Sequence, residues 1–98
     1  MDDRFRAELW EWKAQGGWFF LTLPEELSDG IRARTDRGLR RGFGSVRVEV
    51  TIGGSTWRTS VFPDSASGSY VLPVKKPVRT AEGIEPGDTV DVSLVVEP

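Results

Sequence analysis

The 98-residue sequence contains no cysteine and no histidine. Disulfides, a thiol nucleophile and an imidazole base are therefore excluded, together with the usual zinc ligand sets. Long apolar runs are also absent, since the longest, WFFL, is far too short to cross a membrane. The charged N-terminus, MDDRFRAE, lacks the apolar segment of a secretion signal. We therefore expect a cytoplasmic protein with no metal site and no cofactor.

The charge is nearly balanced, at −2, so no overall field attracts nucleic acid or an anionic membrane. Six arginines nevertheless crowd the stretch from 32 to 47, and three of them fall within DRGLRRGFG: Arg37, Arg40 and Arg41. Two interpretations stay open for this stretch. It is either a solvated loop or a strip of cations that contacts phosphates.

Alternation of apolar and polar residues predicts a mainly β chain. The clearest strands are SVRVEVTI at 45–52 and TVDVSLVV at 89–96, and four others are FRAELWEW, WFFLTL, STWRTSVF and YVLP. The glycine pair 53–54 predicts a tight hairpin turn. Two short helices are expected, one in PEELSDGIRART, which Gly30 should keep short, and one in VKKPVRTAEGI.

The order strand, strand, Leu-Pro, helix, strand occurs twice, around Leu23-Pro24 and around Leu72-Pro73. Chance likeness between short strands is one explanation, and an internal repeat is the other. Two such halves would bury their apolar faces by closing on each other. We therefore expect a single domain, 1–98, that forms a small closed or double-split β-barrel of about six or seven strands with two short helices and pseudo-twofold symmetry.

The segments GFGSVRVEVTIGGSTWRTSVFP and GSYVLPVKKPVR, with the opening FRAELWEW and the closing GIEPGDTVDVSL, resemble the bacterial family of uncharacterised domains called DUF1905. The likeness covers nearly the whole chain. It implies a barrel of the double-split type, and it implies no activity.

A more distant likeness lies in LPVKKPVRTAEGIEPGDTVDVSL, which is similar to the AbrB/MazE-type swapped-hairpin module. Those modules dimerise to complete a barrel and commonly bind DNA. A chain that contains two halves would complete its own barrel, so the structural part of the likeness transfers better than DNA binding.

The segment RGFGSVRV partly matches the signature of the RNA-recognition fold. Ser45 and Val48 stand where that signature needs stacking aromatic residues, and the chain between Leu23 and Arg41 is too short for the extra strand. That fold is excluded.

Arg58 lies in the middle of a predicted strand, among hydroxyl residues. It either pairs across the hairpin with Glu49 or anchors an anion. In the second case, the cations of the later helix would join it: Lys75, Lys76 and Arg79. No constellation of catalytic residues is evident, so an enzyme is the less favoured expectation.

The tryptophans divide by strand face. Trp57 shares a face with Val61 and is expected to fill the barrel. Trp10 and Trp12 share a face with charged residues, so they form either an exposed aromatic patch or a surface beneath the helices.

The function expected from the sequence is a non-enzymatic binding module for a small polar or anionic ligand or for a partner domain. The alternative is a nucleic-acid-binding, regulator-like module, by analogy with the swapped-hairpin barrels.

Overall fold

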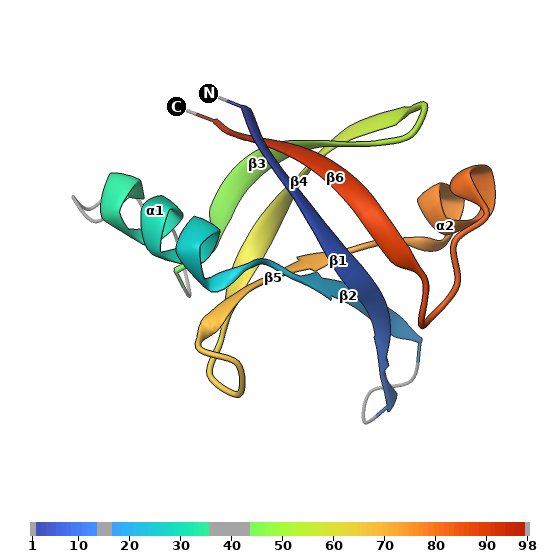
Figure 1. Ribbon diagram of the computed structural model, residues 1–98, viewed down its shortest axis with the longest axis horizontal. Helices are drawn as coiled ribbons and strands as arrows, with labels where there is room; N and C mark the ends of the chain where they lie inside the picture. The colour runs from blue at the N-terminus through green and yellow to red at the C-terminus, as the bar shows by residue number, and fades with distance from the viewer. Residues whose placement is uncertain (1, 14–16, 36–43, 98) are drawn as a thin grey trace.

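The structure, a computed structural model, describes residues 2–13, 17–35 and 44–97. These residues form six strands and two helices in the order β1 (Asp2–Trp12), β2 (Trp18–Thr22), α1 (Glu25–Thr35), β3 (Val46–Ile52), β4 (Ser55–Asp64), β5 (Ser69–Pro73), α2 (Lys76–Glu82) and β6 (Thr89–Val96). The strands close into an antiparallel barrel in the order β1-β2-β5-β4-β3-β6 (Figure 1). The predicted mainly β barrel with two helices is confirmed.

The barrel core is built from the alternating strands. On β3, Val46, Val48, Val50 and Ile52 are buried, while Arg47 between them is exposed. On β2 and β5, Leu21 pairs directly with Leu72, and both side chains are fully buried. Burial of a side chain of this kind stabilises the fold by about 1.5–3 kcal/mol.

The two halves are related by the pseudo-twofold that the sequence predicts at the level of element order, β1-β2-α1-β3 and β4-β5-α2-β6. Reciprocal backbone hydrogen bonds mark the equivalence, because Leu23 N donates to Tyr70 O and Val74 N donates to Phe19 O, both at 2.9 Å. Leu23 thus corresponds to Val74, and Leu72 corresponds to Leu21. The Leu-Pro pairs that suggested the repeat are therefore not structural equivalents.

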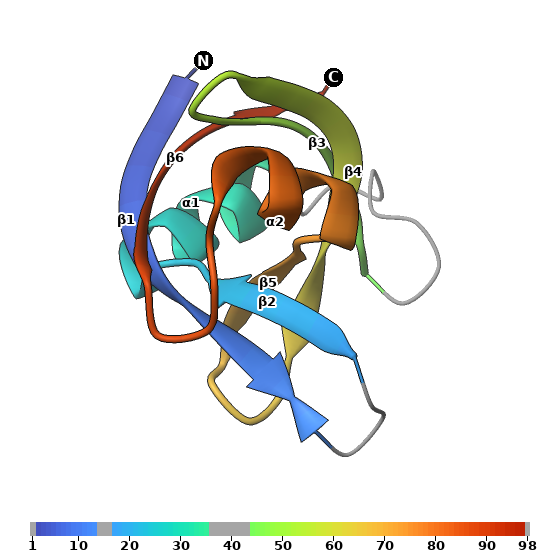
Figure 2. The ribbon, with the colours of Figure 1, turned by 90° about the vertical axis from the view of Figure 1, so that its right-hand side faces the viewer.

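The two helices lie at opposite ends of the barrel (Figures 1 and 2). On α1, the buried Ser28 Oγ accepts a hydrogen bond from Tyr70 N at 3.0 Å, and the Arg32 guanidinium lies 5.6 Å from the centroid of the Tyr70 ring. On α2, the Arg79 guanidinium lies 3.8 Å from the centroid of the Phe19 ring. Each helix thus places an arginine over an aromatic residue of the barrel wall.

The helix α1 spans Glu25–Thr35, within the segment PEELSDGIRART where the sequence predicts a short helix, and it continues through Gly30. A glycine inside a helix costs about 1 kcal/mol relative to alanine. The next residue, Ile31, is fully buried in the core. Its burial offsets the cost of Gly30, which sequence propensity alone did not show.

Gly53→Ala is expected to lower the free energy of unfolding by about 1–2 kcal/mol, because Gly53 has φ 57° in the β3–β4 turn and an added Cβ would overlap the Glu82 carboxylate. That carboxylate accepts hydrogen bonds from Ser55 Oγ and Gly54 N, at 2.5 and 3.4 Å. The matched control is Gly54→Ala, where a Cβ meets no atom within 4 Å. Urea unfolding of both variants checks the difference, and equal stabilities would contradict it.

Candidate functional site

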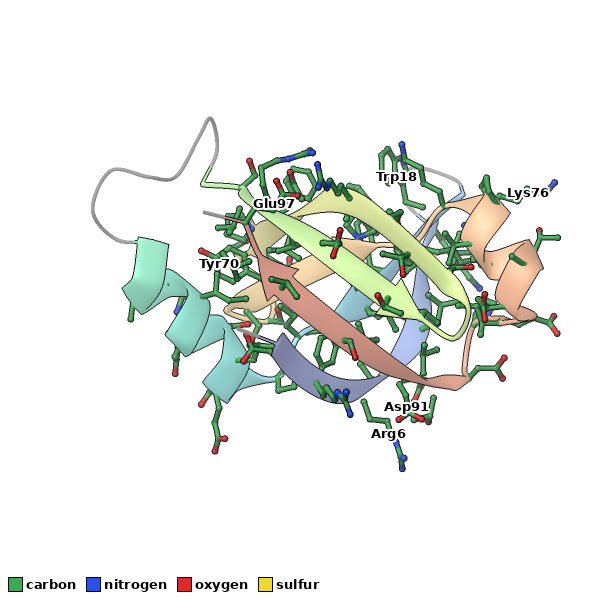
Figure 3. All side chains as sticks on the ribbon, turned by 90° about the horizontal axis from the view of Figure 1, so that it is seen from above. Arg6, Trp18, Tyr70, Lys76, Asp91 and Glu97 are labelled. Atoms are coloured by element: carbon green, nitrogen blue, oxygen red, sulfur yellow. The ribbon has the colours of Figure 1, made fainter. Side chains whose placement is uncertain are left out.

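A basic hollow lies where β2, β5 and α2 meet. Its volume is about 330 Å³, and its lining residues are Gly17, Trp18, Phe19, Pro73, Val74, Lys75, Lys76 and Arg79. We call it the α2 hollow. Figure 3 shows Trp18 and Lys76 at the end of the barrel that carries α2, and Tyr70 at the end that carries α1.

The segment that joins β5 to α2 positions the two lysines. The bond from Val74 N to Phe19 O ties this segment to β2. Lys75 then stands at the N-cap of α2 in an extended conformation, and its side chain makes no capping hydrogen bond. The helix begins at Lys76, and Pro77 fits its first turn because the fixed φ of proline suits a helix. Both lysine side chains are exposed, and neither makes an ion pair within the described part of the chain.

Arg79 is held more tightly than the lysines. Its Nη1 donates to Val74 O at 2.7 Å, and its guanidinium packs on the Phe19 ring. The Val74 carbonyl accepts a hydrogen bond from one of the five N–H donors of the guanidinium, so, within the described residues, the other four remain available. The Arg79 charge is therefore fixed at the wall of the α2 hollow, while Lys75 and Lys76 stand at its rim.

The predicted opposition of Arg58 and Glu49 is present, because the two residues are directly paired across β4 and β3. Arg58 Nε lies 3.8 Å from Glu49 Oε2 and 3.7 Å from Glu97 Oε2, and its side chain is 69% exposed. Arg58 is not among the residues that line the α2 hollow. The structure thus brings Lys75, Lys76 and Arg79 together and gives Arg58 acidic neighbours elsewhere.

A second ion pair supports a structural role for Arg58, as a partner in a cross-strand ion pair. Arg6 on β1 pairs across the sheet with Asp91 on β6, and Arg6 Nε lies 2.7 Å from Asp91 Oδ1. This hydrogen bond and the Asp91 charge raise the pKa of Arg6. Because the pseudo-twofold exchanges β1 with β4 and β6 with β3, the two arginine–acid pairs occupy equivalent strand pairs. A ligand role for Arg58 stays a prediction.

Another hollow, of about 580 Å³, is lined by Arg4, Arg6 and Asp91 among others. The Arg6 charge is already compensated by Asp91, and both side chains are well exposed. This shallow surface is therefore expected to attract an anion less strongly than the α2 hollow does.

The sequence did not identify Trp18 and Phe19 as site residues. Trp18 is 47% exposed although it lies in an apolar run, because it points outward on β2. Strand alternation could have shown that Trp18 and Phe20 share the face opposite to Phe19 and Leu21. Strand alternation could not have shown that Lys75 lines the same hollow as Trp18 and Phe19.

Of Trp10 and Trp12, the second is exposed, as one of the two expected alternatives has it, whereas Trp10 is partly buried and packs beside Phe20. The outer sides of β1, β2, β5 and β4 carry a surface that we call the aromatic face, formed by Trp10, Trp12, Trp18 and Phe62, with the buried Phe20 and Val71 beneath them. Trp12 is 43% exposed and Phe62 is 41% exposed. Trp57, which was expected to fill the barrel, is only partly buried and packs against the core from its edge, so that expectation is met in part.

The alternative nucleic-acid residues, Arg37, Arg40 and Arg41, lie outside the described residues. Within the described ranges, no three acidic side chains gather in a way that could hold a metal ion. The helices in those ranges are too short and too polar to span a membrane.

Comparison with known proteins identifies the family to which this chain is related. Residues 5–94 match the model of a family described as "Domain of unknown function (DUF1905)". A search of curated proteins finds no similar sequence. Since the family match spans most of the chain and agrees with the resemblance in its sequence, the chain belongs to the DUF1905 family.

Proposed function

We propose that this domain is a binding module for a small anionic ligand that has a flat apolar part, and that the α2 hollow is its site. The observation that carries the proposal is the composition of the lining. Three cations converge on one hollow, and no acidic side chain is among its described lining residues. An anion placed there is therefore attracted by each charged neighbour.

The chemistry of each group fits such a ligand. The Arg79 guanidinium is planar and can bind a carboxylate or phosphate through two parallel hydrogen bonds. Lys75 and Lys76 add charge from flexible side chains, which suits several anion geometries. Trp18 and Pro73 provide the apolar surface on which a ring can lie.

The test compares two ligands of nearly the same shape, the anionic naphthoate and the uncharged naphthamide, by isothermal titration calorimetry. Naphthoate should bind at least ~10-fold more tightly, because a hydrogen bond to a charged group contributes about 1.5–3 kcal/mol. Its affinity should also fall as salt is raised. Equal affinities, or no binding of naphthoate at low salt, would refute the proposal.

A further inference from the structure

A second hollow lies in the aromatic face, and it shares no lining residue with the α2 hollow. Its volume is about 370 Å³, and its lining includes Trp10, Trp12, Phe20, Pro63, Asp64 and Val71. We call it the Trp10 hollow. In the sheet order, β2 and β5 separate β1 from β4. The large indole rings of Trp10 and Trp12 on β1 therefore lie on one side of the hollow, and Pro63 and Asp64 of β4 lie on the other. The smaller side chain of Val71 on β5 lies between them.

The rings of this hollow are held in place by the protein itself. The centroid of Phe20 lies 5.2 Å from that of Trp10 and 6.4 Å from that of Trp12, with interplanar angles of 38° and 49°. Trp10 Nε1 donates to Thr22 Oγ1 at 2.9 Å, which fixes the plane of the indole. The rings are thus inclined to one another, and they form the walls and part of the floor of a concave site.

The charge of the Trp10 hollow is opposite to that of the α2 hollow. Asp64 is its acidic residue, and no cationic side chain is among its described lining residues. The Asp64 carboxylate accepts hydrogen bonds from Ser67 Oγ at 2.8 Å and from the backbone N of Ser67 and Ala66 at 3.2 and 3.4 Å. These bonds hold the carboxylate at the edge of the hollow.

We propose that the Trp10 hollow binds a quaternary ammonium group. The faces of aromatic rings carry negative potential, so they attract a cation, and Trp is the strongest of the aromatic residues in this respect. A methylated ammonium also buries its methyl groups against the rings without losing hydrogen bonds to water, as a primary ammonium would. Asp64 adds a formal negative charge. Neither the residues nor the ligand class overlap with those of the anion site proposed above.

The experiment titrates the full chain with choline and, in parallel, with its uncharged carbon analogue, in which a tert-butyl group replaces the trimethylammonium group. Choline should bind at least ~10-fold more tightly than the analogue, because the two have the same shape and differ in charge. In NMR spectra, the indole N–H signals of Trp10 and Trp12 should move with choline, while that of Trp57 should not.

Variants locate the site. Trp12→Ala and Asp64→Asn should each weaken choline binding by about 5- to 10-fold. Phe62→Ala is the matched control, since Phe62 is as exposed as Trp12, lies on the same face and does not line the hollow. It should leave the affinity within about 2-fold.

A short peptide that carries trimethyl-lysine distinguishes the two sources of a quaternary ammonium. Tighter binding of this peptide than of choline assigns the group to a lysine side chain, and tighter binding of choline assigns it to a free metabolite; both results uphold the chemistry. Equal affinity for choline and its uncharged analogue overturns the proposal. A response to a proline-rich peptide with none to either ammonium probe also overturns it.

Discussion

Replacement of Leu72 by alanine is expected to lower the free energy of unfolding by about 2–5 kcal/mol. Leu72 is fully buried and faces Leu21 across the β2–β5 pair, where the two halves of the barrel meet. Truncation removes buried apolar surface and leaves a cavity. The cavity persists because the surrounding strands are hydrogen-bonded into a closed barrel and cannot move inward to fill it. Since a domain of this size is stable by only about 5–15 kcal/mol, the loss is a large fraction of the total. Guanidinium unfolding, followed by circular dichroism, measures it.

Leu72→Met is the matched control, because it keeps the volume of the side chain. It should cost less than about 1.5 kcal/mol. If Leu72→Ala is no less stable than Leu72→Met, the interior at the β2–β5 pair is not close-packed, and the description of a filled barrel is wrong.

The second large effect is expected on ligand affinity. The double variant Lys75→Gln, Lys76→Gln should bind naphthoate about 30- to 100-fold more weakly, because two cations at the rim of the α2 hollow are removed. Both side chains are exposed, so the fold should be retained. Arg79 is left unchanged because its guanidinium packs on Phe19, and its removal would disturb the hollow itself. Calorimetry at fixed ionic strength measures the affinities.

Two control proteins separate the site from the net charge. Arg4→Gln, Arg47→Gln removes the same number of exposed cations from positions outside the α2 hollow, and it should keep the affinity within about 2-fold. Arg58→Gln tests the remaining sequence candidate and should also bind normally. A loss of affinity in Arg58→Gln, with none in the double lysine variant, would move the site to Arg58.

Much of the fold could be predicted because its signals are local. The alternation of valines from 46 to 52 determines which face of β3 is buried. The two-residue turn at Gly53-Gly54 sets the register of β3 and β4, and this register brings Glu49 opposite Arg58. The helix α2 was expected within VKKPVRTAEGI, and it begins at Lys76 and ends at Glu82.

Other features depend on contacts between distant residues. The predicted α1 contains Gly30, and the burial of Ile31 in the core, which propensity does not show, offsets the cost of that glycine. The Leu-Pro repeat suggested one alignment of the halves, whereas the register of β2 and β5 gives another. Which two strands pair is decided by the total apolar surface that the pairing buries. Because this surface comes from residues far apart in the chain, no short stretch of sequence predicts it.

The amino-acid sequence by itself determined the strands, the β3–β4 turn and the absence of cysteine and histidine chemistry, because each depends on neighbouring residues or on composition. It also showed Lys75, Lys76 and Arg79 as a basic group, since they are close along the chain. Only the tertiary structure decided that Trp18 and Phe19 join these cations, and that Trp10 and Asp64 share a hollow. The physical reason is barrel closure, which places β2 against β5 and carries side chains from distant segments to a common surface.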